Sequence, residues 1–191
     1  MKPFVLESAR LRLDSLQASD SARVHQYCQD PQFERFLTIP WPYRPHDADF
    51  YINEHVPRGW TGGSELTWAL RATGGDFLGV LCLRLPRGDV GYWLGAEHRG
   101  NGFMPEALSA LADWVFTTRS AELEQLSWEA MTGNFASMAV ARKAGFTYTG
   151  TAPARLPVRD GSHPPAWNGV LRAGDDRSVK PGWPDPPKTQ E

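Results

Sequence analysis

A turn with two glycines and an arginine is the first stretch of the sequence whose residue types suit chemistry. It reads RGNG over residues 99–102, and it lies between an apolar run and a run with helical spacing. Glycines let a backbone approach a ligand closely and adopt positive φ, and free N–H groups at the start of a helix attract anions. The stretch therefore predicts a phosphate-binding turn, with an ordinary strand–turn–helix connection as the alternative.

Two common phosphate-binding patterns do not fit this turn. A dinucleotide fingerprint would have a third glycine where the sequence has Pro105. A P-loop would have lysine followed by serine or threonine at the start of the helix, and neither is found there. Apolar residues after the turn still recur at helical spacing, which predicts a helix packed on a sheet; they are Met104, Ala107, Leu108, Leu111, Trp114 and Val115.

The elements that would position this turn are those of an α/β (α+β) chain. Apolar runs predict strands, the first of them half-solvated, at residues 9–13, 65–71, 77–85, 90–94, 123–131, 146–151 and 166–172. Cap residues and helical spacing predict helices at 19–29, at 45–56 with Pro57 as its end, from about 104, and at 134–144. Residues 60–64 are expected to form a loop. This order predicts a mixed sheet with helices on both faces.

A second notable stretch begins at Asn134 and ends at Phe146. Asn134 is a good N-cap residue, and Gly145 suits the position that ends a helix. Taken alone, this pattern indicates a capped helix followed by a buried strand.

Together, the two stretches resemble signatures of the GNAT N-acetyltransferase superfamily. EHRGNG at residues 97–102 resembles its acyl-CoA loop, Gln/Arg-x-x-Gly-x-Gly/Ala, except that Glu97 takes the first place. Asn-x-x-Ser at 134–137, followed by Lys-x-Gly-Phe at 143–146, resembles the second diagnostic segment. The preceding Gly-Tyr-Trp-Leu is most similar to the branch that acetylates N-termini of ribosomal proteins. The resemblance covers roughly residues 8–172.

This resemblance implies a GNAT-like, mostly antiparallel sheet whose central strand pair splays apart. The arm of acetyl-CoA would lie in the gap between the strand at 90–94 and the strand that contains Leu126. The residues implied to bind the cofactor are Leu94, Arg99, Gly100, Asn101, Gly102, Phe103, Met104 and Asn134.

The implied reaction is direct transfer of acetyl to a primary amine, without a covalent intermediate. Many members protonate the departing thiolate with a tyrosine, but this chain has Ala141 at that place. The resemblance then implies Ser137 as the acid. A carboxylate should take the proton of the amine, and the candidates are Glu65 and Glu129, with Asp89 third. The alternative for each is a solvated charge at a strand end.

The acceptor is expected to enter beside the first two helices and the loop between them. Trp41, Tyr43 and Trp60 are candidates for the walls of its pocket, and packing between helix and sheet is the alternative role. The resemblance favours the N-terminus of a peptide or protein as acceptor. A small amine or amino acid, a non-catalytic acyl-CoA-binding module and a nucleotide-binding α/β domain are the other interpretations.

Composition limits which other classes of protein the chain can belong to. The chain has 191 residues, of which 41% are hydrophobic, so we expect one domain at residues 1–173 and a Pro-rich, poorly ordered tail at 174–191. A net charge of −2 gives no case for nucleic-acid binding. Two cysteines suit a reducing cytoplasm, no run approaches membrane-spanning length, and five scattered histidines predict no metal site. The resemblance allows a monomer or a homodimer.

Overall fold

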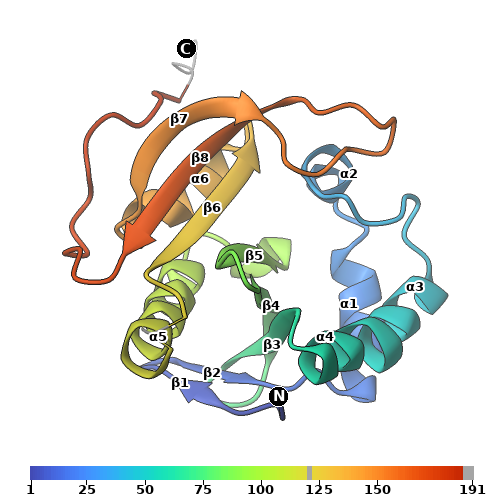
Figure 1. The fold of residues 1–191 in the computed structure, drawn as a ribbon. Coiled ribbons are helices and arrows are strands. Elements are labelled where there is room, and N and C mark those ends of the chain that lie inside the picture. Colours follow the sequence, from blue (N-terminus) through green and yellow to red (C-terminus); the bar gives the residue numbers. More distant parts are fainter. Residues whose placement is uncertain (120–121, 187–191) are drawn as a thin grey trace.

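A computed structural model describes residues 1–119 and 122–186. The described residues form an eight-stranded sheet with the strand order β1-β2-β3-β4-β5-β6-β8-β7 (Figure 1). The strands are β1 (Leu6–Glu7), β2 (Leu11–Asp14), β3 (Glu65–Ala72), β4 (Phe77–Arg84), β5 (Asp89–Leu94), β6 (Gln125–Met131), β7 (Thr147–Pro153) and β8 (Pro165–Arg172). Neighbouring strands are antiparallel except for β5 and β6. The predicted mixed, mostly antiparallel sheet is confirmed.

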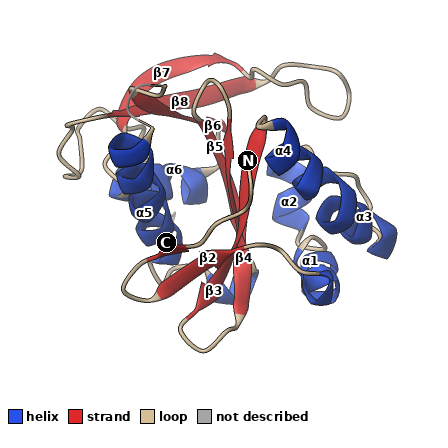
Figure 2. Cartoon of the chain, turned by 60° about the horizontal axis from the view of Figure 1, so that its bottom comes forward, coloured by secondary structure: helices blue, strands red, loops and turns tan. Residues whose placement is uncertain are grey.

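Helices cover both faces of this sheet, as expected from the sequence. Figure 2 shows α5 and α6 on one side and α1 to α4 on the other. Their bounds are α1 (Ser21–Tyr27), α2 (Pro31–Phe36), α3 (Pro45–Phe50), α4 (Val56–Gly62), α5 (Phe103–Thr118) and α6 (Phe135–Lys143). No helix within the described ranges is long and apolar enough to cross a membrane.

The central pair of strands separates almost as soon as it forms. β5 and β6 are parallel and share one bridge, between Asp89 and Ser127. Beyond that bridge the two strands diverge (Figure 1), and the rest of β5 has no partner strand on this side. The predicted splay is therefore confirmed.

The core is divided between the two faces of the sheet because side chains alternate along each strand. On the face covered by α5 and α6, Leu66, Val90 and Trp128 belong to the larger buried cluster. On the other face, Ala69 and Val80 join a second cluster with side chains from α1, α2 and α3. Each strand therefore presents one set of residues to each layer of helices.

Pro57 does not end the helix that begins at Pro45, contrary to the expectation from the sequence. A π-helical turn at Tyr51–His55 follows α3 and leads directly into α4. Pro57 lies in the first turn of α4, where a missing N–H is tolerated. The expected loop at 60–64 is therefore helical as far as Gly62, and Gly63 ends the helix with φ 66°.

The structure describes the C-terminal segment from residue 174 to residue 186. Arg177 pairs with Asp113 of α5 at 2.9 Å, and the ring of Trp183 lies 5.5 Å from those of Trp128 and Tyr148. Residues 187–191 lie outside the described residues. The domain limits and the poor order expected for residues 174–191 stay predictions.

Candidate active site

The predicted phosphate-binding turn joins β5 to α5 with its glycines in the expected conformation. Gly100 has φ 81° and Gly102, the N-cap of α5, has φ 78°. A Cβ atom on Gly100 would meet no other atom within 4 Å, and one on Gly102 would meet only Arg10 Nη2, at 3.5 Å. Within the described residues the backbone N–H groups of residues 100–104 have no acceptor, so the turn can offer them to an anion at the start of a sixteen-residue helix.

Arg99 connects this turn to the end of β5 and to the N-cap residue of α2. Its Nε and Nη2 donate to the Leu94 carbonyl at 3.2 and 3.0 Å, and its Nη1 lies 2.6 Å from Asp30 Oδ2. The guanidinium also lies over the ring of Phe33. The charge of Arg99 is thus partnered by α2 and its cap, and a direct contact with a phosphate stays a prediction.

Arg10 supplies a second positive charge beside the turn, and no sequence pattern predicts it there. Its Nη1 donates to the carbonyl of Asn101 at 3.1 Å, and its guanidinium lies over the Phe103 ring. Glu106 of α5 accepts a hydrogen bond from its Nε at 2.7 Å. Only the fold brings residue 10 to a turn that follows it by some ninety positions.

The splay exposes backbone groups of β5 on the side of β6. The N–H of Gly95 donates to Leu78 in β4 at 2.9 Å, and alternation along the strand then turns the groups of Tyr92 and Leu94 toward the gap. The Leu94 carbonyl accepts from Arg99, while the N–H of Leu94 keeps no partner strand on this side. An extended ligand arm can pair with these groups.

A cavity of about 460 Å³ lies between α2 and the start of α6. It is lined by Pro31, Gln32, Arg35, Phe36, Gly133, Asn134, Phe135 and Ala136. The predicted cofactor residue Asn134 therefore lines an open cavity, and its Oδ1 also accepts from the N–H of Ser137 at 3.1 Å as the helix cap. Both interpretations of Asn134, ligand contact and cap, are compatible with its position.

The hydroxyl of Ser137 is held between two aromatic side chains. The indole N–H of Trp128 in β6 donates to Ser137 Oγ at 3.1 Å. Tyr92 in β5 donates to the Ser137 carbonyl at 3.0 Å, and its hydroxyl also lies 3.0 Å from Oγ. Burial raises the pKa of Tyr92 well above its ordinary value, so the phenol stays protonated. Since Tyr92 gives its proton to the carbonyl, the O–H of Ser137 can donate to Tyr92 Oη while Oγ accepts from the indole.

Neither Tyr92 nor Trp128 is among the site residues that the sequence predicts. Both read as ordinary core aromatics, and Trp128 is indeed 1% exposed. Alternation along β5 and β6 was the one available signal, because it puts both side chains on the face where the helix with Ser137 packs. Their meeting at one hydroxyl depends on the angle of the splay, which the sequence does not encode locally.

The three candidate carboxylates lie on the opposite face of the sheet from Ser137. Glu65, Asp89 and Glu129 alternate with residues of the larger buried cluster, so they point toward the layer of α1 to α4. Arg155 Nε lies 2.9 Å from Glu129 Oε2, and its Nη1 bonds Asp89. The structure therefore brings Glu129 and Asp89 together through one guanidinium.

Glu65 belongs to a neighbouring group on the same face. Its Oε2 accepts from Arg84 Nε at 2.9 Å, and its Oε1 lies 3.2 Å from His55 Nε2 and from Thr67 Oγ1. Each candidate base is thus held by an arginine in this structure. His55 has no signal in the sequence, since only the turn of the helix places it beside β3.

Two of the three aromatic residues proposed as pocket walls lie in the core. Trp60 is 2% exposed, packs against Phe4 and Trp68, and donates its indole N–H to the Thr67 carbonyl at 3.0 Å. Tyr43 is 5% exposed in the second cluster. Both side chains take the packing role that was the alternative, while Trp41 is half-buried.

Both cysteines are buried free thiols. Burial raises the pKa of Cys28 and of Cys82 to about 12, so neither is a thiolate near neutral pH. This agrees with a reaction that uses no covalent enzyme intermediate. Within residues 1–119 and 122–186, no three His, Cys, Asp or Glu side chains are grouped to hold a metal ion.

Known structures with this fold include several acetyltransferases. A putative ribosomal-protein-serine acetyltransferase from Vibrio cholerae is 21% identical, with a TM-score of 0.72, and the match covers 90% of this chain and 99% of that one. RimL, a ribosomal alpha-N-protein acetyltransferase in complex with coenzyme A, is 19% identical, with a TM-score of 0.75 over 91% of this chain and all 100% of its own.

A third solved structure is RimJ from Mycobacterium smegmatis in complex with a CoA disulfide. It is 19% identical, with a TM-score of 0.74, and the match covers 90% of this chain and 87% of that one. At these identities the likeness concerns the fold. Comparison with curated protein sequences gave no match.

Sequence comparison with protein families carries the assignment further. The family described as the acetyltransferase (GNAT) domain matches residues 10–147, which include the glycine turn, the splayed strands and the helix of Ser137. The turn with its open amides and the single bridge between β5 and β6 are the features by which such a domain would receive acetyl-CoA. The chain is an acetyltransferase that belongs to the GNAT family.

Proposed function

We propose that this acetyltransferase moves the acetyl group of acetyl-CoA directly onto the primary amine at the N-terminus of a peptide or protein. The single bridge between Asp89 and Ser127 is the observation that carries the proposal. It opens a gap in the sheet beside β5, and the turn after β5 has backbone N–H groups without an acceptor in the described part of the chain. The RimL and RimJ structures of the same fold contain CoA or a CoA disulfide.

The residues that would hold acetyl-CoA lie on both sides of this gap. Amides from Arg99 to Met104, including those of Gly100, Asn101, Gly102 and Phe103, would bind the pyrophosphate, and Arg10 adds a charge beside them. The free N–H of Leu94 would pair with the pantetheine arm, and Asn134 would contact it from the cavity.

The chemistry requires one base and one acid. As the amine nitrogen forms its bond to the acetyl carbon, the carbon–sulfur bond breaks, and the amine passes a proton to a carboxylate. Glu65 and Glu129 remain the proposed bases, with Asp89 third. The departing thiolate takes its proton from Ser137, whose hydroxyl is oriented by Trp128, and solvent water returns a proton to Ser137. Most of the rate enhancement would come from positioning amine and thioester together.

The choice of a chain terminus as acceptor rests on relatives of the same fold. Three of the solved structures with this fold are described as acting on N-termini of ribosomal proteins or on ribosomal-protein serine. Half-buried Trp41 is the remaining aromatic candidate for a wall of the acceptor site. We place the enzyme in the cytoplasm, where two free thiols persist, acting as a monomer or a homodimer.

Calorimetry and a thiol-release assay test the proposal together. We expect CoA and acetyl-CoA to bind, with no heat from ATP or NAD. Peptides that begin with serine or alanine should then release CoA thiol, whereas the same peptides with a blocked N-terminus should not. Binding of CoA without turnover on any amine would support a non-catalytic module, and binding of ATP or NAD alone would support a nucleotide domain.

A further inference from the structure

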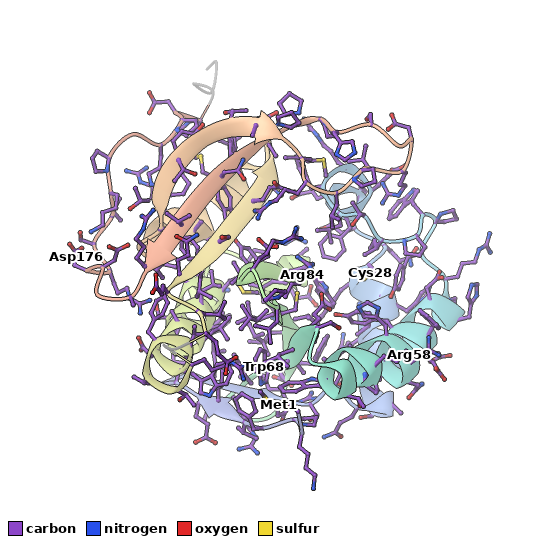
Figure 3. All side chains as sticks on the ribbon, viewed as in Figure 1. Met1, Cys28, Arg58, Trp68, Arg84 and Asp176 are labelled. Carbon is purple, nitrogen blue, oxygen red and sulfur yellow. The ribbon has the colours of Figure 1, made fainter. Side chains whose placement is uncertain are left out.

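The guanidinium of Arg84 lies over Gly91 of β5, on the face of the sheet that the acceptor would approach. A Cβ atom on Gly91 would stand 2.8 Å from Arg84 Nη2 and 3.2 Å from Nη1, so the guanidinium fills the space of a missing side chain. Figure 3 shows Arg84 in the middle of the molecule, between β6 and the helices α1 and α4. Only a glycine at position 91 leaves room for the Arg84 guanidinium in this position.

One edge of the Arg84 guanidinium is fixed and the other is open. Its Nε donates to Glu65 Oε2 at 2.9 Å, and Glu65 is itself held by His55 and Thr67. No hydrogen bond joins Nη1 or Nη2 to another residue within the described ranges, and 43% of the side chain is exposed. Arg84 therefore presents two positioned donors to the space beside the central strand.

The carboxylates on this face already have partners, whereas the Nη edge of Arg84 has none within the described residues. Glu65 binds Arg84 and His55, Asp89 binds Arg87 at 3.0 Å and also Arg155, and Glu129 binds Arg155. The planar fork of a guanidinium matches a carboxylate, with two parallel N–H···O bonds. An anionic group on the acceptor would therefore match the charge and the geometry of the open edge of Arg84.

We infer that Arg84 binds a carboxylate that lies close to the amine of the acceptor, so that the enzyme selects acidic acceptors. The inference rests on the proposed function, since it concerns the acceptor of the same site. The carboxylate can belong to an acidic side chain just after the N-terminal residue of a peptide, or to a free amino acid. Both sources offer the same chemistry, and the experiment below separates them.

The test uses matched acceptors with the full-length protein saturated with CoA. Peptides that begin Ser-Asp or Ser-Asn and are otherwise identical form one pair, and serine and serinamide form the other. Calorimetry measures binding, and thiol release from acetyl-CoA measures kcat/KM. We expect the acidic member of one pair to be favoured by about tenfold or more. The pair that shows the preference identifies the source of the carboxylate.

Variants of Arg84 and Gly91 connect this preference to the guanidinium. Arg84→Gln should reduce the preference to within about twofold while the affinity for CoA stays unchanged, and Arg84→Lys should restore it only in part. Gly91→Ala should also reduce it, because the new methyl group displaces the guanidinium. Arg58→Gln, on an exposed pair of α4 with Glu54, is the matched control and should keep the full preference.

Two results would overturn the inference. One is equal binding of both members in both pairs by the wild-type protein. The other is a preference that survives in Arg84→Gln, or in Gly91→Ala should the first variant fail to fold. The calorimetric measurement needs no turnover, so a preference in binding without acetylation of any acceptor would refute the proposed function and leave the inference about Arg84 standing.

Discussion

The indole nitrogen of Trp128 lies 3.1 Å from the hydroxyl oxygen of Ser137 and donates a hydrogen bond to it. A buried side chain of β6 thereby fixes the direction of a hydroxyl in the first turn of α6. With the indole N–H on one lone pair, the hydroxyl still has its own proton to donate, and Tyr92 Oη lies 3.0 Å away. The hydrogen bond thus orients a hydroxyl that could otherwise bond only its own helix, as the proposed role of Ser137 as the acid requires.

Replacement of Ser137 by alanine should lower turnover much more than affinity for acetyl-CoA. Loss of a general acid typically costs about 10²-fold or more in rate. Trp128→Phe keeps the aromatic packing and removes only the N–H, so we expect a smaller loss, about fivefold, from one neutral hydrogen bond. Thiol-release kinetics with calorimetric CoA affinities will check both. A Ser137→Ala enzyme as active as wild type would remove Ser137 from the mechanism.

A charged side chain in the glycine turn should prevent cofactor binding without unfolding the chain. Gly100→Glu or Gly102→Glu would place a carboxylate where the pyrophosphate is proposed to lie. The control is Gly174→Glu, because Gly174 also has a positive φ, 84°, and no atom near its missing Cβ. Calorimetry should detect no CoA binding by the two turn variants and normal binding by the control. Unimpaired binding by Gly100→Glu would contradict this site.

The pairing of Arg155 with both Asp89 and Glu129 should contribute measurably to stability. Arg155→Ala removes the guanidinium that Asp89 of β5 and Glu129 of β6 share as a partner. Because both carboxylates are partly buried, we expect a loss of about 2 kcal/mol in the free energy of unfolding. Arg58→Ala removes an exposed pair with Glu54 and should cost under about 1 kcal/mol. Urea titration measures both, and equal losses would show that Arg155 stabilises no more than a surface pair.

The two buried thiols predict a loss of stability in alkaline solution. Burial raises the pKa of Cys28 and Cys82 from 9.0 to about 12, so above pH 9 the unfolded chain releases protons that the folded chain retains. The free energy of unfolding should therefore fall as pH rises from 9 toward 12, by up to about 1.4 kcal/mol per pH unit for each thiol.

A cysteine-free variant isolates this contribution. Between pH 9 and pH 10, the slope for Cys28→Ala/Cys82→Ala should be shallower than that for wild type, whereas the two slopes should agree between pH 7 and pH 8. Identical slopes above pH 9 would show that the thiols titrate normally in the folded chain.

The parts of this fold that the sequence predicted are those with local signals. Turn glycines, cap residues and the alternation of apolar residues located the strands from Glu65 to Leu94 and the helices after Gly102 and Asn134 within one or two residues. The prediction that Pro57 ends the helix was wrong because the effect of a proline on a helix depends here on the preceding π-helical turn. That turn has no recognisable local pattern.

The residues of the site also fall into those with a local sequence signal and those without one. The glycine turn and Ser137 lie in segments with their own sequence signatures, so both could be found. Arg10, Tyr92 and Arg84 could not, because each acquires its position from a strand or turn distant in the sequence. Trp60 was misjudged as an acceptor wall because a tryptophan beside glycines reads the same whether it faces a cleft or the core.

The contact between Trp183 and Trp128 gives the last part of the chain a bearing on the reaction. Trp183 follows every strand of the sheet in the sequence, so the sheet can form while the indole that bonds Ser137 still lacks this neighbour. Covering of the Trp128 ring by this segment, rather than closure of the sheet, would then complete the surroundings of Ser137.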